Sequence, residues 1–386
     1  MRHFTYVCAD PGIPVPGSKG ASIHVASVCH AFREAGLDGE VFTLRPEAES
    51  MDGLAVHRIE VPPRRKRKSV EDREARLFLA SLNSLIAPGN RPDFVYERYS
   101  LWHCGGLARA RELEIPFILE VNSPLPVEAS SFRSLANQDL AEGIAQLLLR
   151  DADGIVCVSD EVAKWVVDRR GHRRGVWVIP NGVDPDLFSP RHEPRPRPLP
   201  PVGVPLIAFS GSFRPWHGLE DLLVAFRILV SSRVHDAHMV CVGDGPMRQQ
   251  FEENVRSSGM ANRVHITGHL PHQEVPNWLR GADVAVAPYP DLDHFYFSPL
   301  KIFEFLSLGL PTISCDVGQV PELLPHQERG LLCAPGNPEE LAAAMEQLLN
   351  NRLEARRMAD RGRRWVLDNA TWSKRVSEIL TRIDAL

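Results

Sequence analysis

The sequence has few cysteines and no apolar run of bilayer length. Its seven cysteines stand far apart, and no two of them form a Cys-x-x-Cys pair. This spacing excludes a zinc ribbon and a disulfide framework, and it predicts reduced, buried thiols in a cytoplasmic protein. The first residues, MRHFTYVCADPG, are too polar for a signal peptide. The absence of a long apolar run argues against a membrane-spanning helix.

A surplus of positive charge is also missing. Lys and Arg number 44 against 49 Asp and Glu, which gives a net charge of -5. A protein whose main ligand is nucleic acid needs a surplus of basic side chains, so we expect no nucleic-acid partner. One basic run, RRKRK at 64–68, leaves two interpretations open. It is either a solvated loop or a surface for an anionic acceptor or the anionic lipids of a membrane, which would make the protein membrane-peripheral.

What the chain does have is length and a regular alternation of apolar runs with helical patterns. A chain of 386 residues exceeds what one hydrophobic core organises, so two domains are expected. The strand-like runs are FTYVCA, EVFTL, DFVYERYS, IPFILEVN, GIVCVS and VWVIPNG, then LIAFSGS, HMVCVGDG, VHITGHL, ADVAVAPY and PTISCD. The pattern predicts an α/β protein with two Rossmann-like, doubly wound domains that face each other across a cleft.

Proline marks the expected domain boundary. The stretch SPRHEPRPRPLPPVGVP cannot form a helix or a central strand, so it predicts an interdomain linker. We therefore expect an N-terminal domain over 1–190, a linker over 191–203 and a C-terminal domain over 204–370. The amphipathic pattern over 371–386 predicts a last helix that returns to the N-terminal domain.

One apolar segment, YFSPLKIFEFLSLGLP, carries a lysine and a glutamate three residues apart. It predicts a helix that is capped by Ser298, has Pro299 at its first position and ends at the Gly-Leu-Pro sequence. At about 100° per residue, Lys301 and Glu304 share the side opposite the main apolar face. Two interpretations are open: a half-buried helix with a solvated polar edge, or a helix whose polar edge binds a ligand.

Two glycines, Gly17 and Gly20, lie between the first predicted strand and the first predicted helix. Glycine at such a place lets backbone amides approach a ligand. The string from Gly12 to Lys19 is not a P-loop, because Ser18 separates the lysine from the second glycine and two prolines lack amides. The alternative to a ligand-binding loop is a structural turn.

A second set of loops follows the predicted strands of the C-terminal half. FSGSFRPWHG ends a strand at Gly211 and places Arg214 and His217 before the next helix. VGDGP, which contains Gly243, and TGHLP, which contains Gly268, each follow another strand. Because open α/β sheets bind ligands at the carboxyl ends of their strands, these loops are expected at one binding edge.

In order and spacing, these motifs resemble those of the retaining family 4 glycosyltransferases of the GT-B fold. The resemblance covers nearly the whole chain and rests on PGSKGASIHV, VIPNGVDPDLF, GSFRPWHGLEDLL, VGDGP and SPLKIFEFLSLGLPTISCDVGQVPELL. It implies a hexosyltransferase that binds a nucleoside diphosphate sugar in the C-terminal domain and the acceptor in the N-terminal domain. It also implies retention of the anomeric configuration, through front-side attack assisted by the leaving phosphate.

The resemblance assigns roles to residues of the C-terminal domain. Glu304 matches the family glutamate that holds the ribose hydroxyls, and a carboxylate can accept two hydrogen bonds from a diol. The amides at the helix start meet the diphosphate, because a helix N-terminus favours an anion. Contacts from the backbone of 268–270 select the base. The expected donor-binding residues are Gly17, Gly20, Gly211, Arg214, His217, Gly243, Gly268, His269, Leu270, Ser298, Leu300, Lys301 and Glu304.

The chain departs from the family pattern at the phosphate site. Pro299 stands where the motif usually has a glycine and lacks an amide, so Leu300 and Lys301 must supply the donors. The Arg and Lys that the family places in the first loop of this domain align with Ser212 and His217. The charge of Lys301 is expected to compensate.

Further departures concern the diphosphate clamp and the sugar. Arg214 is the candidate for the clamp, and the alternative is that it pairs with a surface acid. Tyr296 stands eight positions before Glu304, where the family has a second glutamate that recognises the donor sugar. The run DLD from Asp291 to Asp293 resembles a metal-binding Asp-x-Asp, but it is expected to form a loop before the donor helix.

In the first domain the strand IPFILEVN ends in polar residues. Glu120 is a candidate to polarise the acceptor hydroxyl, and Asn122 is a candidate to bond the donor sugar. The alternative is that Glu120 pairs with Arg98 and is structural. Lys19, Glu97 and Arg98 are the expected acceptor-binding residues, and the expected catalytic residues are Glu120, Asn122, Arg214 and Lys301.

The function expected from the sequence is a metal-independent hexosyltransferase with no cofactor beyond its nucleoside diphosphate sugar. Its acceptor is a hydroxyl of a glycan, a lipid-linked sugar or a small metabolite. Two alternatives are open: a nucleotide-sugar 2-epimerase, which needs no acceptor, and a sugar-binding protein without chemistry. The base, the sugar, the acceptor and the oligomeric state do not follow from the sequence.

Overall fold

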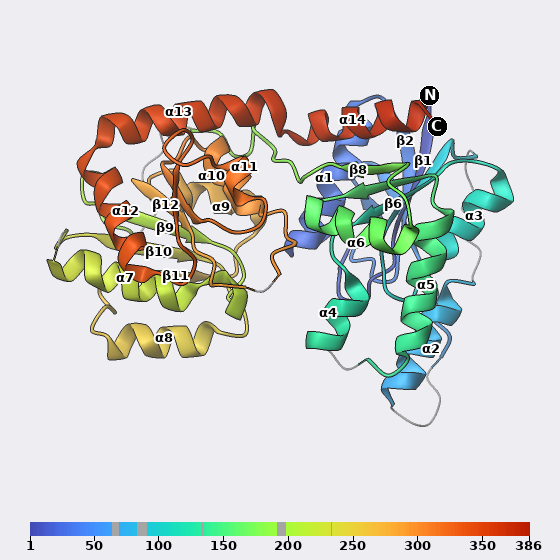
Figure 1. Cartoon of the computed structure of the whole chain (residues 1–386), viewed down its shortest axis with the longest axis horizontal. Helices are drawn as coiled ribbons and strands as arrows, with labels where there is room; N and C mark the ends of the chain where they lie inside the picture. The colour runs from blue at the N-terminus through green and yellow to red at the C-terminus, as the bar shows by residue number, and fades with distance from the viewer. Residues whose placement is uncertain (64–68, 83–90, 133–134, 191–197, 233, 293) are drawn as a thin grey trace. The chain divides into compact units, whose positions relative to one another are not determined.

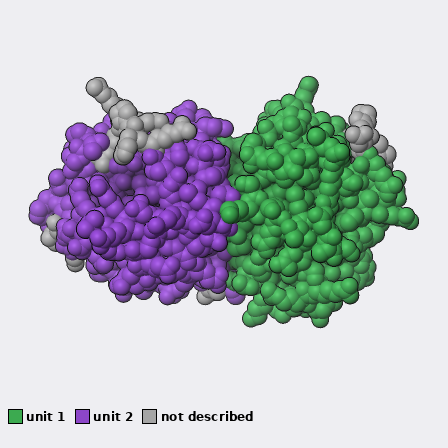
Figure 2. Space-filling view, turned by 90° about the horizontal axis from the view of Figure 1, so that it is seen from above, with its two compact units in different colours: residues 1–181, 296–298, 372–386 green, residues 182–295, 299–371 purple. Residues whose placement is uncertain are grey.

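The computed structural model describes residues 1–63, 69–82, 91–132, 135–190, 198–232, 234–292 and 294–386. The basic run at 64–68, the middle of the proline-rich stretch and Asp293 lie outside the described residues. The chain divides into two compact units, coloured separately in Figure 2. Unit 1 comprises Met1–Asn181, Tyr296–Ser298 and Trp372–Leu386, and unit 2 comprises Gly182–Phe295 and Pro299–Thr371.

Unit 1 is built on an eight-stranded sheet with the order β3-β4-β2-β1-β5-β6-β7-β8. Neighbouring strands are parallel except β3, which pairs antiparallel with β4. The order reverses between β1 and β5, so the loops after these two strands flank a topological switch point. The strands are β1 (His3–Cys8), β2 (Asp38–Thr43), β3 (Ser50–Met51), β4 (Leu54–Arg58), β5 (Phe94–Arg98), β6 (Phe117–Val121), β7 (Gly154–Cys157) and β8 (Val176–Val178).

Helices flank both faces of this sheet (Figure 1). They are α1 (Gly20–Glu34), α2 (Val70–Ala80), α3 (Gly105–Leu113), α4 (Leu125–Phe132), α5 (Gln138–Asp151), α6 (Asp160–Arg170) and α14 (Trp372–Asp384). Helix α14 packs against α1, where Trp372 meets the ring of His24 edge-on at 5.0 Å between centroids. The two chain ends meet in this unit through an ion pair between Arg2 and Asp384.

Unit 2 contains a six-stranded, all-parallel sheet with the order β11-β10-β9-β12-β13-β14. This is the strand order of a dinucleotide-binding Rossmann fold, and its switch point lies between β9 and β12. The strands are β9 (Leu206–Ser210), β10 (His238–Val242), β11 (Val264–Gly268), β12 (Val284–Ala287), β13 (Thr312–Cys315) and β14 (Leu331–Cys333). Every residue of β9, β12 and β13 is buried, as expected for strands covered on both faces.

The helices of unit 2 connect these strands. They are α7 (Leu219–Ser232), α8 (Arg248–Ser257), α9 (Val275–Leu279), α10 (Leu300–Ser307), α11 (Val320–Leu323), α12 (Pro338–Asn350) and α13 (Arg352–Asn369), with 3-10 turns η1 (Pro215–His217) and η2 (His272–Glu274). Helix α12 packs against α7, and α10 packs against α13. The ring of Phe213 meets that of Phe209 at 6.1 Å and that of Phe251 at 5.6 Å, within the core of this unit.

Helix α10 follows β12 and starts one residue later than the sequence predicts. Pro299 is the cap residue and Leu300 the first helical residue, and the Ser298 hydroxyl does not cap the helix. The interpretation of a solvated polar edge is wrong, because Lys301 and Ser307 are buried along with the apolar face. The Ser307 hydroxyl donates to the Phe188 carbonyl at 2.8 Å, so the polar side of the helix is packed by protein.

The chain passes from unit 1 to unit 2 at Gly182, so the predicted boundary at residue 190 lies inside unit 2. The residues that follow Gly182 form hydrogen bonds with the rest of unit 2. Val183 pairs with Thr371, and Arg280 donates to the carbonyls of Leu187 and Ser189. The proline-rich stretch therefore follows a segment that is already docked.

The predicted fold class is confirmed: the protein is α/β, with two Rossmann-like parallel-sheet domains. All the strand-like runs named from the sequence form strands, and the predicted helices form near the expected places. The sequence reasoning missed the short strands β3, β4 and β14. Over the part of the chain that the structure describes, no helix combines the length and apolar character needed to cross a membrane.

Candidate active site

The first feature of the candidate site in unit 2 is a close approach of the loops that follow β9 and β10. Gly211 follows β9 with a φ of +142°, and Gly243 follows β10 with a φ of +145°. A Cβ at Gly243 would lie 2.0 Å from the Gly211 carbonyl oxygen, so only glycine fits there. A Cβ at Gly211 would lie 3.0 Å from Nζ of Lys301 and 3.6 Å from Nδ1 of His217. The structure thus brings Gly211, His217 and Lys301 together.

Lys301 is a buried cation without a counter-ion. It is 8% exposed, and its Nζ has no hydrogen-bond partner among the residues that the structure describes. The ammonium lies 4.5 Å from the ring centroid of Phe209 and 5.5 Å from that of Tyr289. Burial lowers the pKa of Lys301 to about 7, although the charge of Glu304 acts in the opposite direction. An unpaired buried ammonium is costly to a folded protein, and an anionic ligand would relieve this cost.

His217 does not contribute a charge to this place. Its Nδ1 is hydrogen-bonded to the Ser212 carbonyl, so the proton of the neutral ring is on Nδ1. Burial, followed by the charge of Lys301, lowers the pKa of His217 to about 3. The imidazole is therefore neutral near pH 7 and presents an acceptor nitrogen. The predicted compensation by the charge of Lys301 stays a prediction.

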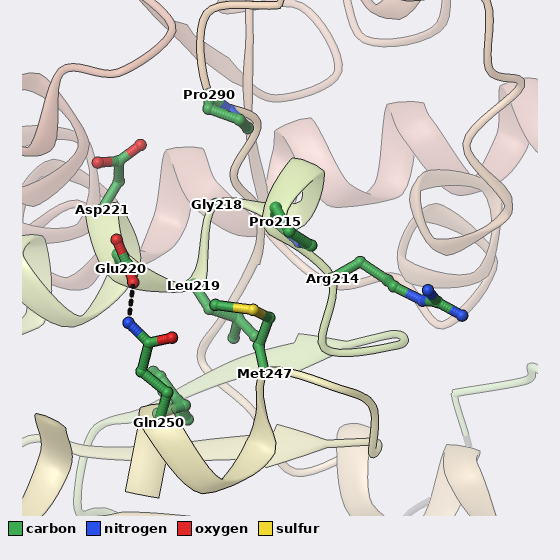
Figure 3. A pocket seen from close by; sticks show the side chains of 10 residues that line it. Arg214, Pro215, Gly218, Leu219, Glu220, Asp221, Met247, Gln250 and Pro290 are labelled. Atoms are coloured by element: carbon green, nitrogen blue, oxygen red, sulfur yellow. Dashed lines mark hydrogen bonds between the residues drawn. The ribbon is translucent and has the colours of Figure 1, made fainter. Parts of the chain in front are cut away.

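Arg214 lines a pocket at the start of α7, which is shown in Figure 3. The guanidinium points away from Glu220 and Asp221 of the same pocket, while Gln250 donates to Glu220 at 3.3 Å. The Arg214 guanidinium lies 5.5 Å from the Trp216 ring centroid. Within the described residues, Arg214 forms no ion pair. The alternative of a surface ion pair thus has no support in this structure. The role of Arg214 in a diphosphate clamp stays a prediction.

Glu304 lies on α10, one turn after Lys301. Its Oε1 is 3.2 Å from Nε2 of His272, which the sequence analysis did not single out. The carboxylate side chain is 13% exposed, so it can still meet a ligand. Its predicted contact with a ribose diol stays a prediction, and its position in the same helix as the buried ammonium is consistent with one bound nucleotide.

The predicted base loop is fixed by a charged network. Gly268 ends β11 with a φ of +73°, and a Cβ there would lie 2.8 Å from Nη1 of Arg248. Arg248 pairs with Asp244 at 2.9 Å, and the Asp244 carboxylate also accepts a hydrogen bond from the backbone of His269. The side chain of His269 is exposed and that of Leu270 half-buried. Asp244 was visible in the VGDGP motif, but its reach to His269 is a tertiary contact.

The three residues Tyr296–Ser298, which precede Pro299 and α10, belong to unit 1. The Ser298 hydroxyl accepts from the Asn181 amide at 3.0 Å, and the Asn181 side chain donates to the Ser298 carbonyl at 2.8 Å. The Tyr296 carbonyl accepts a hydrogen bond from the Ser159 hydroxyl at 2.9 Å. The phenol hydroxyl of Tyr296 donates to Oε2 of Glu128 at 3.4 Å. Ser298 thus anchors the segment, and its predicted donor contact has no separate support.

In unit 1, Glu120 is buried at the end of β6, with an exposed fraction of 2%. Its carboxylate accepts hydrogen bonds from Tyr96 Oη at 2.7 Å, Arg98 Nη1 at 3.0 Å and Asn122 Nδ2 at 2.5 Å. His24 Nε2 lies 2.8 Å from Oε1. Burial raises the pKa of Glu120, but the interactions with His24, Arg98 and Tyr96 outweigh it and lower the pKa to about 2. This geometry favours the structural alternative: an ionised carboxylate saturated by donors is a poor base.

The remaining predicted residues of unit 1 make local contacts, and their predicted binding roles stay predictions. Glu97 is fully buried, contacts His103 at 2.9 Å and accepts from the Gly106 amide at 3.0 Å at the start of α3. Lys19 donates to the Gly12 carbonyl at 2.8 Å. A Cβ at Gly17 would lie 2.7 Å from Pro14, and Gly20 is simply the first residue of α1, which fits the structural-turn interpretation.

His24 and Tyr96 complete the cluster around Glu120, and the sequence analysis missed both. The signal for His24 was a polar residue on the apolar side of the first predicted helix. The signal for Tyr96 was a hydroxyl inside a buried strand. Within the described residues, no three His, Cys, Asp or Glu side chains are grouped as they would be around a metal ion.

Comparison with solved structures identifies the fold. The chain aligns with sucrose-phosphate synthase from Thermosynechococcus elongatus at a TM-score of 0.77 and 19% identity, over 100% of this chain and 99% of the other. It also aligns with Anabaena HepE in complex with UDP-glucose at a TM-score of 0.72 and 15% identity, over 100% of both chains. The fold is that of a GT-B glycosyltransferase.

Two family models place the chain more narrowly. Residues 18–187 match Glycosyltransferase Family 4, and residues 204–351 match Glycosyl transferases group 1. The chain belongs to the family 4 glycosyltransferases, and the predicted family is confirmed.

Curated relatives agree with this assignment. The chain is 28% identical to a 2-deoxystreptamine glucosyltransferase of Streptomyces kanamyceticus, over 68% of this chain and 69% of the relative. It is 25% identical to a D-inositol 3-phosphate glycosyltransferase of Nocardiopsis dassonvillei, over 86% of this chain and 81% of the relative. The protein is a glycosyltransferase, and the alternatives of an epimerase or a non-catalytic sugar-binding protein have no support here.

The buried Lys301 generates a prediction about stability. Lys301→Met keeps the aliphatic length and removes the unpaired charge, so it should raise the free energy of unfolding at pH 7 by on the order of 1 to 4 kcal/mol. The folded-state pKa of about 7 is below the unfolded value of about 10.4. Between these values the unfolded chain binds more protons, so the wild-type penalty is full below pH 7 and is relieved as the pH rises toward 10.4.

Chemical denaturation at pH 6.5, 8 and 9.5 measures this gain, which should shrink as the pH rises. Lys164→Met, at an exposed position on α6, is the matched control and should change stability by less than about 0.5 kcal/mol. A destabilised Lys301→Met protein, or a gain that does not depend on pH, would contradict the assignment of an uncompensated buried ammonium.

The Glu120 cluster generates a second stability prediction. Glu120→Gln removes the charge that compensates Arg98, whose side chain is only 12% exposed, so it should destabilise the protein by about 3 to 5 kcal/mol. Glu112→Gln changes a side chain that is 63% exposed and should cost less than about 0.5 kcal/mol. Denaturation followed by fluorescence measures both variants. Equal, small effects would show that Glu120 is not the electrostatic centre of unit 1.

Proposed function

We propose that the protein transfers a hexosyl group from a nucleoside diphosphate sugar to an acceptor hydroxyl, with retention and without a metal ion. The observation that carries the proposal is the buried ammonium of Lys301, which lies beside Gly211 and has no hydrogen-bond or ion-pair partner among the residues that the structure describes. A diphosphate is the anion that this site would accept in a glycosyltransferase. HepE, a structural neighbour, was solved in complex with UDP-glucose.

The donor is assigned to unit 2. The charge of Lys301 neutralises the diphosphate, and the amides of Leu300 and Lys301 at the start of α10 donate to it. Glu304 holds the ribose diol, and the loop from Gly268 to Leu270 contacts the base. Arg214 provides the second cation. Because these cations and the helix terminus carry the leaving charge, no metal ion is required.

The acceptor is assigned to unit 1, near the polar cluster at the end of β6. Asn122 and Arg98 are the candidates for contact, since Glu120 is already saturated by four neighbours. The names of two relatives give small acceptors, 2-deoxystreptamine and D-inositol 3-phosphate. A small hydroxylated molecule is therefore our first choice over a glycan or a lipid-linked sugar at a membrane surface. A cytoplasmic location is part of this proposal.

The saturated Glu120 carboxylate supports a mechanism that does not use it as a base. The acceptor oxygen attacks the anomeric carbon from the face that the diphosphate leaves. The new C–O bond forms as the bond to the phosphate oxygen breaks, and the acceptor proton passes to that phosphate oxygen. Glu120 then positions Asn122 and Arg98 and takes no proton, which its low pKa favours.

Nucleotide binding tests the donor site. Lys301→Met and Arg214→Ala should weaken a nucleoside diphosphate at least tenfold more than the matching nucleoside, because only the diphosphate meets the cations. Glu304→Gln should weaken both by about 1 to 3 kcal/mol, since both carry the ribose. Titration calorimetry with UDP, GDP and ADP in EDTA selects the base. Glu253→Gln, an exposed change on α8, is the control.

If Lys301→Met weakened the binding of the diphosphate and of the nucleoside by the same factor, the phosphate assignment would be wrong. Unchanged affinity in Glu304→Gln would remove the ribose assignment.

Product stereochemistry tests the reaction. An α-linked donor should give an α-linked glycoside in proton NMR of the early product, and EDTA should leave most of the activity. Glu120→Gln, at a temperature where it is folded, should keep at least a few per cent of the rate, because a true general base contributes about 10²- to 10⁴-fold. A β-linked product, or a rate lost in EDTA and restored by manganese, would overturn the proposed mechanism.

A further inference from the structure

The neighbour of Glu304 is the strongest unassigned group in the candidate site. His272 opens η2, and its Nε2 lies 3.2 Å from Oε1 of Glu304. The other carboxylate oxygen, Oε2, has no hydrogen-bond or ion-pair partner within the described part of the chain. One oxygen of the carboxylate is therefore held and the other is free to accept a hydrogen bond from a ligand.

The imidazole is itself fixed from its other side. Its ring lies 5.2 Å from the ring of Phe188, at an interplanar angle of 49°. Phe188 is buried, its amide donates to the Asp184 carbonyl at 3.0 Å, and its carbonyl accepts from the Ser307 hydroxyl. Ser307 and Glu304 are both on α10, so the same helix bears the carboxylate and anchors the ring that backs the imidazole.

The place of His272 in the chain adds a second connection. It comes four residues after Gly268, and the proposed base loop of Gly268 to Leu270 leads through Pro271 directly into η2. The backbone of His269 is held by Asp244. His272 thus joins the end of a fixed loop to the carboxylate on α10.

We propose that His272 is a positioning residue for the nucleotide: it orients Glu304 so that the free oxygen meets the ribose diol. With a proton on Nε2, the ring donates to Oε1, which leaves the lone pairs of Oε2 for a ribose hydroxyl. A carboxylate that is preoriented in this way loses less rotational freedom on binding. This inference rests on the proposed ribose contact of Glu304.

The ribose itself discriminates this role from a packing role. If His272 acts through Glu304, its effect must depend on the ribose hydroxyls and disappear when they are absent. If it only packs on Phe188, its removal should weaken every nucleotide alike or lower stability alone. A double-mutant cycle between protein and ligand separates the two cases.

The experiment is titration calorimetry of the full chain with the binding nucleoside diphosphate and with its 2′,3′-dideoxy form. His272→Ala should weaken the ribonucleotide roughly 3- to 15-fold and the dideoxy form less than twofold. His272→Asn, which keeps a donor, should recover part of the loss. His265→Ala, on β11 and stacked on His238 outside the site, should leave both ligands unchanged.

The outcomes also separate the inference from the proposed function. If Glu304→Gln caused a ribose-dependent loss of affinity and His272→Ala caused none, only the role of His272 would be overturned. If His272→Ala weakened the binding of the ribonucleotide and of the dideoxy form by the same factor, the role of His272 would also be overturned. No ribose-dependent loss in Glu304→Gln would overturn the ribose assignment on which this inference rests.

Discussion

The candidate site of unit 2 depends on one unfavourable interaction, the burial of a lysine ammonium without a counter-ion. Nζ of Lys301 lies against two aromatic faces and a glycine, and no described residue accepts a hydrogen bond from it. Cation–π contacts return about 0.5 to 2 kcal/mol, which is less than the several kcal/mol of desolvation. Folding tolerates this because helix α10 buries Ile302, Phe303, Phe305 and Leu306 completely, at about 1.5 to 3 kcal/mol each.

The two units treat a buried charge in opposite ways. Glu120 of unit 1 is surrounded by His24, Tyr96, Arg98 and Asn122, so its charge is compensated within the fold and its pKa falls to about 2. Lys301 has no such partner in the described part of the chain, and its pKa falls to about 7, the direction expected of an uncompensated base. A compensated charge stabilises a structure, whereas an uncompensated one is available to a ligand. This contrast separates the structural cluster from the candidate binding site.

The sequence predicted the elements well because their signals are local. Apolar runs of four to six residues bounded by glycine and proline form the buried strands, and Pro299 marks the start of α10 within one residue. The environment of Lys301 was not predictable in the same way. Helical periodicity put it on a polar side, but Phe209 and Tyr289 come from distant segments and bury it. The contacts of His272, Asn181 and His24 are tertiary in the same sense.

The charged groups near Gly211 come from two different elements. The loop after β9 carries a neutral His217 and the exposed Arg214, whereas the buried Lys301 comes from α10. The Arg214 guanidinium lies 5.5 Å from the Trp216 ring centroid, while Lys301 lies beside Gly211. A second charge at His217, beside the buried Lys301, would be costly in a low dielectric, and the neutral imidazole avoids this cost. Because a helix is more rigid than a loop, the charge on α10 keeps a fixed relation to Glu304, one turn further along the same helix.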